Sequence, residues 1–317
     1  MEKLLNGSLF SLDPMWWSIL DWNREKKSII LSASDWRERV RLLRTLEMDT
    51  IILQFAVAEG KSFYPSTLFP SAFDDEVDRF AAILDEAASH GIAVYLPMGS
   101  LAPTYRATND ITDPARLDRT EALMGELIDR YGALPAFAGW FIAEEPQKGL
   151  YEGREYLSAV CRLAHRLTPG KPVICAPHIL NDGIEDAALL RDLGFDILWT
   201  QVMAERCTAT GALWRNGEPW SDRLSRVARV KQACDGAGIR FWAEYEIFDF
   251  GEQRAYLLPA DIERLRFQLP GLSRWAEKIV VCGIPGLMED PGAQRPLGSE
   301  RAFKLFQDYS SDGTLEP

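Results

Sequence analysis

Short apolar runs alternate along the chain with amphipathic segments, and there are eight of each. The apolar runs are rich in β-branched and aromatic residues and are bounded by Gly, Pro or charged residues. Because they are continuous rather than alternating, they indicate strands that are buried on both faces of a parallel sheet. The runs span residues 8–12, 49–57, 91–99, 137–145, 171–179, 195–203, 239–248 and 278–286.

The amphipathic segments between these runs predict helices. The segment 34–48 opens with Asp35 and Glu38 at the spacing of a capping box. The segment 75–91 has an apolar face at helical spacing and should stop at Gly91. The remaining predicted helices cover residues 116–132, 152–167, 182–194, 222–238, 259–269 and 299–309.

Eight strand–helix repeats in a chain of 317 residues predict an α/β fold, a single-domain (β/α)8 TIM barrel. The predicted core covers about residues 8–310, and no linker-like stretch or change in composition divides residues 1–317. A doubly wound sheet is the alternative fold, because a strand count taken from a single sequence is subject to error.

Charge and hydropathy narrow the range of partners. The formal net charge is −12, and no run of Lys and Arg is long enough to form a nucleic-acid-binding stripe. An acidic surface disfavours polyanions and anionic membranes and favours neutral or cationic small ligands. We find neither an apolar run of membrane-spanning length nor the apolar core of a signal peptide. These features predict a cytoplasmic protein that binds neither nucleic acid nor membrane.

Cysteine and histidine usage argues against a metal or a disulfide framework. The five cysteines are scattered and lack CxxC spacing, as expected of reduced thiols. With three histidines in the chain, carboxylates would have to dominate any metal site. Motifs of dinucleotide-binding, P-loop, zinc-protease and serine-hydrolase sites are also absent from the sequence. We therefore expect neither a metal nor a cofactor.

Acidic residues lie where two of the predicted strands end, which is where (β/α)8 barrels carry their chemistry. The fourth run leads through Trp140 and Ile142 to Glu144 and Glu145. Adjacent residues of an extended segment point to opposite sides, so we expect at most one of these two acids to face the barrel axis.

The seventh run carries two further acids. Glu244 and Glu246 are both in phase with Trp242, so they should share one face of the strand. Glu289 and Asp290 follow the eighth run and are expected to be loop acids.

Neutral polar and aromatic residues lie near the ends of other predicted strands. A buried amide bonded to the backbone, a structural histidine or an aromatic in the core would explain each of them without a ligand. Our candidates for substrate binding are Gln54, Tyr64, His178, Gln201, Trp214 and Phe248.

Carboxyl groups at the ends of strands four and seven, flanked by aromatic residues, fit the cleavage of a glycosidic bond. One carboxyl group gives a proton to the leaving oxygen, and the other acts as nucleophile or base. A retaining enzyme holds the two groups about 5 Å apart. Aromatic faces can stack on sugar rings and exclude water.

The segment GWFIAEEP (139–146) resembles the strand-four motif of the clan A glycoside hydrolases, in which an Asn-Glu-Pro triplet holds the acid/base. The match gives the acid/base position to Glu145. It places Glu144 where the family has Asn, so the hydrogen bond that this Asn makes to the sugar 2-hydroxyl is not expected to carry over.

Roughly residues 8–290 are similar to a bacterial domain-of-unknown-function family of TIM barrels that resemble glycoside hydrolases. In that family the strand-seven acid lies two residues before a Phe, which implies Glu246 before Phe248; the spacing from Gly238 also allows Glu244. The resemblance is carried by TIILQFA and YPS (50–66), HGIAVYLPMG (90–99), YGALPAFAGWFIAEEP (131–146), KPVICAPHI (171–179), DILWTQV (196–202) and FWAEYEIF (241–248).

These observations together predict a glycosidase that acts on a carbohydrate substrate, with retaining chemistry favoured. Glu145 would protonate the leaving oxygen and later activate water, and Glu246 would attack the anomeric carbon. Glu144 and Glu244 are the alternative catalytic acids.

Two other functions are compatible with the same fold. A metal-dependent sugar isomerase or epimerase would use Glu145, His178 and Glu246 as ligands for Mn²⁺ or Mg²⁺. A non-catalytic carbohydrate-binding barrel would bind sugar without turnover.

Overall fold

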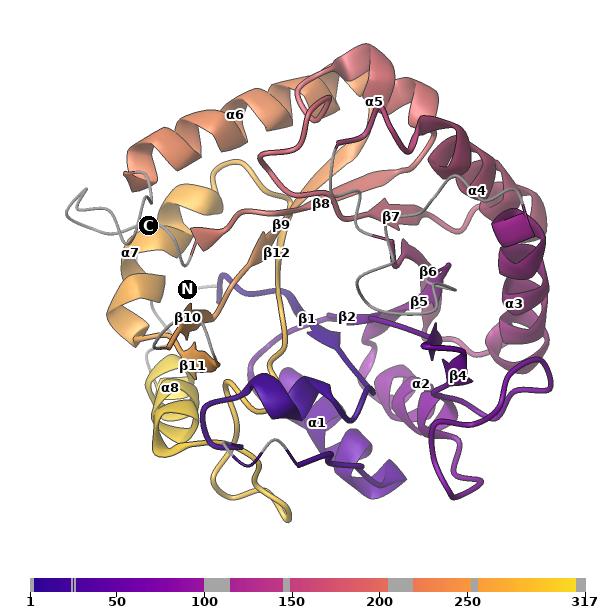
Figure 1. Ribbon diagram of the computed structural model, residues 1–317. Helices are drawn as coiled ribbons and strands as arrows, with labels where there is room; N and C mark the ends of the chain where they lie inside the picture. Colours follow the sequence, from indigo (N-terminus) through magenta and orange to yellow (C-terminus); the bar gives the residue numbers. More distant parts are fainter. Residues whose placement is uncertain are drawn as a thin grey trace.

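The computed structural model describes residues 3–23, 25, 27–99, 115–144, 149–204, 219–251 and 256–311. In this part of the chain, eight parallel strands form a closed barrel in which the last strand pairs with the first (Figure 1). Closure rules out the doubly wound sheet and confirms the predicted (β/α)8 barrel. The barrel strands are β1 (Gly7–Phe10), β2 (Thr50–Leu53), β5 (Ala93–Met98), β6 (Phe137–Ile142), β7 (Val173–Cys175), β8 (Ile197–Gln201), β9 (Arg240–Tyr245) and β12 (Lys278–Val281).

A ring of helices surrounds the barrel, each following one barrel strand along the chain (Figure 1). Each predicted helical segment overlaps one of these helices, with boundaries that differ by a few residues. No described helix is long and apolar enough to cross a membrane. The helices are α1 (Ala33–Thr45), α2 (Arg79–His90), α3 (Ala115–Tyr131), α4 (Arg154–Leu167), α5 (Ala187–Leu193), α6 (Trp220–Ala237), α7 (Ile262–Leu272) and α8 (Glu300–Ser311).

Local sequence explains where the first two helices begin and end. The N-cap of α1 is Ser32, and Asp35 completes the capping box, so the predicted pair of Asp35 and Glu38 was wrong by one turn. Helix α2 begins after the N-cap Asp78 and ends at Gly91 as predicted. Gly91 adopts a left-handed φ of 68°, which a residue without a Cβ accepts readily.

Three small elements that the hydrophobic pattern did not predict lie in the loops after barrel strands. They are the 3-10 helix η1 (Trp16–Ile19), the antiparallel pair β3 (Val57–Ala58) and β4 (Lys61–Ser62), and the antiparallel pair β10 (Phe248–Phe250) and β11 (Leu257–Pro259). They follow β1, β2 and β9, so all three lie on the side of the carboxyl ends of the strands. The predicted single strand 239–248 is in fact two strands, because the chain turns after Tyr245 and pairs again from Phe248.

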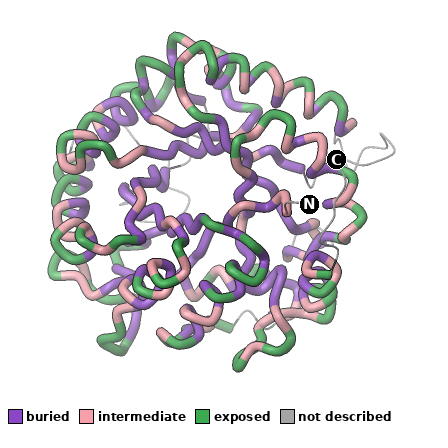
Figure 2. Tube along the Cα trace, turned by 180° about the vertical axis from the view of Figure 1, so that it is seen from behind, coloured by how far each residue is buried: buried purple, intermediate pink, exposed green. Residues whose placement is uncertain are grey.

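The core fills the barrel and the layer between barrel and helices, and exposed residues lie mainly on the outer helix surfaces and loops (Figure 2). Inside the barrel, Tyr95 and Trp242 make an edge-to-face contact with ring centroids 5.6 Å apart. Gly139 makes room for this packing, since a Cβ there would lie 2.9 Å from the Tyr95 ring. This packing fills the barrel below the carboxyl ends of the strands, where (β/α)8 barrels carry their ligands.

Candidate active site

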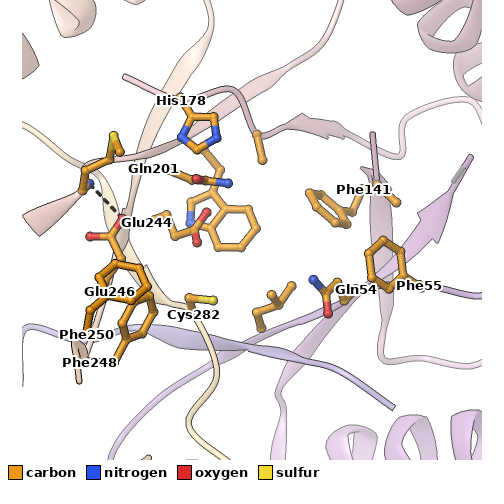
Figure 3. Close-up of a pocket in the computed structure, with 15 residues that line it drawn as sticks. Gln54, Phe55, Phe141, His178, Gln201, Glu244, Glu246, Phe248, Phe250 and Cys282 are labelled. Atoms are coloured by element: carbon orange, nitrogen blue, oxygen red, sulfur yellow. Dashed lines mark hydrogen bonds between the residues drawn. The ribbon is translucent and has the colours of Figure 1, made fainter. Parts of the chain in front are cut away.

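A cavity of about 230 Å³ lies at the carboxyl ends of the barrel strands. Its lining residues lie in or directly after every barrel strand except β5, and in the β10 segment (Figure 3). This is the face at which (β/α)8 enzymes carry their chemistry. The lining residues are Leu9, Gln54, Phe55, Phe141, Ala143, Ala176, His178, Trp199, Gln201, Met203, Glu244, Glu246, Phe248, Phe250 and Cys282.

Strand alternation decides which side chains reach this pocket. Along β9 and the residues that follow it, Glu244, Glu246 and Phe248 line the pocket. The intervening Tyr245 points outward instead, and its hydroxyl donates to Gln268 of α7 over 2.6 Å. The prediction that Glu244 and Glu246 share one face of the strand is therefore confirmed.

Glu244 is the acid that projects into the pocket, on the same side as Gln201 and Cys282 (Figure 3). It pairs in register with Gln201 of β8, and it is 6% exposed. A carboxyl group at this place can face a ligand in the pocket from a rigid strand rather than from a loop.

Glu246 lines the same pocket, but hydrogen bonds bind its carboxylate to the backbone of a neighbouring segment. One carboxylate oxygen accepts from the main-chain N–H of Met203 over 2.8 Å, and the other accepts from that of Ala204 over 2.6 Å. Figure 3 shows this carboxylate turned toward the pocket wall. Both oxygens thus hold the end of β8 to the end of β9.

Most of the predicted substrate contacts come together here. The pocket includes Gln54, His178, Gln201 and Phe248. Main-chain contacts fix two of them, since the N–H of Ile179 donates to the carbonyl of Gln201 over 3.1 Å and His178 forms a parallel bridge with Gln201. These side chains can present amide and imidazole groups to hydroxyl groups of a ligand.

Tyr64, a predicted substrate contact, does not line this pocket. The side chain is 1% exposed and packs against Phe80 and Tyr131. Its hydroxyl donates to Glu126 of α3 over 2.5 Å, and burial followed by this hydrogen bond raises the pKa of the hydroxyl. Sequence position alone did not reveal the Glu126 partner, which lies 62 residues away.

Glu144 also lies away from the pocket. Its carboxylate accepts from Arg116 of α3 over 2.9 Å and from the hydroxyl of Tyr156 of α4 over 3.2 Å, so it faces the helices. It is 1% exposed, and a Cβ at Gly99 would lie 2.0 Å from one of its oxygens. Of the adjacent acids at the end of β6, this one does not face the barrel axis, and its neighbour Ala143 does.

Glu289 lies in a separate part of the fold. Its buried carboxylate pairs with Arg39 of α1 and accepts from the main-chain N–H of Gly286 over 3.3 Å. Burial raises its pKa to about 7, against the opposing charge of Arg39. It lines a different cavity of about 200 Å³ beside α1.

Two predicted site residues, Glu145 and Trp214, lie outside the described residues. Within the described ranges, no group of three or more His, Cys, Asp or Glu residues could hold a metal ion.

Several pocket residues were missed by the sequence analysis. Phe141 and Cys282 could have been found by extending the period-two alternation to the end of each strand. Phe250 could not, because it belongs to the β10 strand, which the hydrophobic pattern merged with strand seven.

Comparison with known proteins gives one family match. Residues 7–295 match the family described as Domain of unknown function (DUF4434). The chain belongs to this family. Nothing among the curated proteins matches this DUF4434 chain.

Solved structures with the same fold include several glycoside hydrolases. A "putative alpha-L-fucosidase" from Bacteroides thetaiotaomicron is 16% identical, with a TM-score of 0.75, over 97% of this chain and 93% of that one. The endo-1,4-beta-mannanase of Rhizomucor miehei is 11% identical, with a TM-score of 0.59, over 98% and 94%.

A beta-glucuronidase from an uncultured Clostridium is 13% identical, with a TM-score of 0.58, over 97% of this chain and 50% of that one. The DUF4434 chain thus spans about half the length of that enzyme. At these identities the likeness shows the fold.

Proposed function

We propose that this DUF4434 chain is a glycoside hydrolase in which Glu145 is the acid/base and Glu244 is the nucleophile. The observation that carries the proposal is the pocket itself. It combines a buried carboxyl group on a barrel strand with aromatic rings and neutral hydrogen-bonding side chains. Such a pocket suits a neutral sugar ring, whose faces stack on aromatic groups and whose hydroxyl groups bond to amides.

The choice of Glu244 over Glu246 follows from the hydrogen bonds of Glu246 and from the place of Glu244 in the pocket. Both carboxylate oxygens of Glu246 accept from main-chain N–H groups, so an attack on a sugar carbon would have to break these contacts. Glu244 projects into the pocket from within β9. We therefore give it the role that the sequence analysis assigned first to Glu246.

The choice of Glu145 over Glu144 rests on alternation along β6. Phe141 and Ala143 line the pocket, while Glu144 faces α3 and α4. Position 145 continues the spacing of two residues that separates Phe141 from Ala143. The motif GWFIAEEP supports the same choice.

The proposed reaction has two steps. A carboxylate oxygen of Glu244 bonds to the anomeric carbon as the bond to the leaving oxygen breaks, and Glu145 gives that oxygen its proton. Glu145, now a carboxylate, takes a proton from water as the water oxygen attacks the anomeric carbon and releases Glu244. This sequence returns both groups to their starting states with retention at the anomeric carbon.

The test is turnover of a panel of aryl glycosides by the wild type, Glu145→Gln and Glu244→Gln. We expect both variants to lose about a thousandfold or more in kcat, because each lacks a group that acts on the reacting atoms. Glu121→Gln is the matched control, since it makes the same change at an exposed position of α3.

Each assay is run with and without EDTA. Turnover that requires a metal would instead favour a metal-dependent isomerase or epimerase. Sugar binding without turnover in the wild type would favour a non-catalytic barrel.

A further inference from the structure

The segment that follows β8 is held in place by side chains from three different elements. Arg223 of α6 donates to the carbonyl of Val202, and Gln268 of α7 donates to the carbonyl of Ala204 over 3.1 Å. Between these contacts, the carboxylate of Glu246 accepts from the two main-chain N–H groups of Met203 and Ala204.

Met203 lies between Val202 and Ala204, and these contacts fix all three residues. Its φ of 57° is left-handed, which is unfavourable for a residue with a Cβ and persists where surrounding contacts enforce it. This backbone conformation directs the Met203 side chain into the wall of the pocket. A group that fixes residues 203 and 204 therefore also shapes the pocket.

The backbone of Glu246 is itself fixed by a side chain of α7. Arg264 of α7 donates to its carbonyl oxygen over 2.7 Å and to that of Phe248 over 2.9 Å. The turn between β9 and β10 is thereby tied to α7, and the Glu246 carboxylate has a rigid base from which to reach across to β8.

We propose that Glu246 is a positioning residue whose carboxylate clamps the backbone of Met203 and Ala204, so that Met203 keeps its place in the wall of the pocket that holds Glu244. It acts on substrate affinity through this wall and takes no part in bond breaking. The kinetic part of this inference rests on the proposed glycosidase function; the clamp itself does not.

The experiment compares Glu246→Gln with Glu244→Gln in the intact chain by hydrogen exchange. Gln keeps the size of Glu but places an NH₂ group against one of the two main-chain N–H donors. We expect the amides of Met203 and Ala204 to exchange about tenfold faster or more in Glu246→Gln and to be unchanged in Glu244→Gln. Unchanged exchange in Glu246→Gln would overturn the clamp, whether or not any glycoside is turned over.

Steady-state kinetics on an aryl glycoside then separates positioning from catalysis. We expect Glu246→Gln to raise KM about tenfold with kcat within about threefold of the wild type, whereas Glu244→Gln loses kcat. A thousandfold loss of kcat at unchanged KM in Glu246→Gln would make Glu246 catalytic. Faster exchange with both KM and kcat unchanged would reduce the contact to a purely structural one, and would also overturn the proposal.

A second variant covers the case in which Glu246→Gln does not fold. Glu246→Asp keeps the charge but shortens the side chain by one methylene, so the carboxylate no longer reaches both N–H groups. It should show faster exchange at residues 203 and 204 and a raised KM. Wild-type values for both would contradict the clamp.

Discussion

The buried ion pair between Arg116 and Glu144 supports the end of β6, and its removal should cost the fold far more than the removal of a surface pair. Arg116 is 3% exposed and Glu144 is 1% exposed, with 2.9 Å between nitrogen and oxygen. Replacing Arg116 by Met leaves the Glu144 carboxylate buried without its cation. Breaking one partner of a buried pair typically costs about 3–5 kcal/mol.

The size of the chain converts this cost into a melting temperature. With about 2.1 cal/mol/K of unfolding entropy per residue, a chain of this length has about 0.7 kcal/mol/K in total. A loss of 3–5 kcal/mol should therefore lower Tm by about 4–8 °C in Arg116→Met. Differential scanning calorimetry at pH 7, checked by chemical denaturation, measures this shift.

Two further variants make the reasoning refutable. Arg166→Met removes an exposed partner of Glu121, where both side chains are about half exposed, and should shift Tm by about 1 °C or less. The double variant Arg116→Met/Glu144→Met should recover much of the loss, because neither charge of this pair is left buried without the other. A Tm of Arg116→Met within about 1 °C of the wild type, or a double variant less stable than the single one, would refute the account.

Two more predictions concern pH and substrate charge. Burial raises the pKa of Glu126, but hydrogen bonds from Ser66, Tyr64 and Thr67 outweigh it and hold the pKa below its ordinary value. Because this pKa is lower in the folded state, ionised Glu126 stabilises the fold at pH values above its ordinary pKa. The stabilisation is lost as the pH falls through the pKa of the folded state. The Tm difference between wild type and Glu126→Gln should therefore shrink between pH 6 and pH 3; a constant difference would contradict the assignment. The second prediction is that an aryl galactoside is turned over at least about 100-fold better in kcat/KM than the matched galacturonide. The carboxylates of Glu244 and Glu246 repel a substrate carboxylate, by about 3 kcal/mol each at 5 Å and an effective dielectric constant of 20. Equal rates for the two substrates would contradict this.

The barrel could be predicted from the sequence because its signal is repeated and local. Each buried strand gave a continuous apolar run, and each covering helix gave an amphipathic segment. A misplaced boundary in one repeat therefore did not change the number of strand–helix repeats. The residues that follow β9 show the limit of this signal. The apolar pattern runs through Ile247 and Phe248, but hydrogen bonds from Arg264 turn the chain there, and nothing in the local pattern marks that contact.

The candidate site could be predicted as a place and a set of residue types, but not as a set of roles. Alternation placed Glu244 and Glu246 on one face of the strand, and both line the pocket. It could not show that the Glu246 carboxylate binds backbone N–H groups more than 40 residues earlier in the chain. The same holds for Glu144, which follows β6 and whose partner Arg116 lies on helix α3. Such long-range partners decide which buried carboxylate is structural.

The most direct test of the central claim, that Glu244 is the nucleophile, is to trap the covalent intermediate. The wild type is incubated with a panel of activated 2-deoxy-2-fluoro glycosides, for which hydrolysis of the glycosyl-enzyme is slow, and the labelled peptide is mapped by mass spectrometry. We predict a single label on Glu244 and its loss in Glu244→Gln. A label on Glu246, or no label from a fluorinated form of a sugar that the enzyme turns over, would contradict the account.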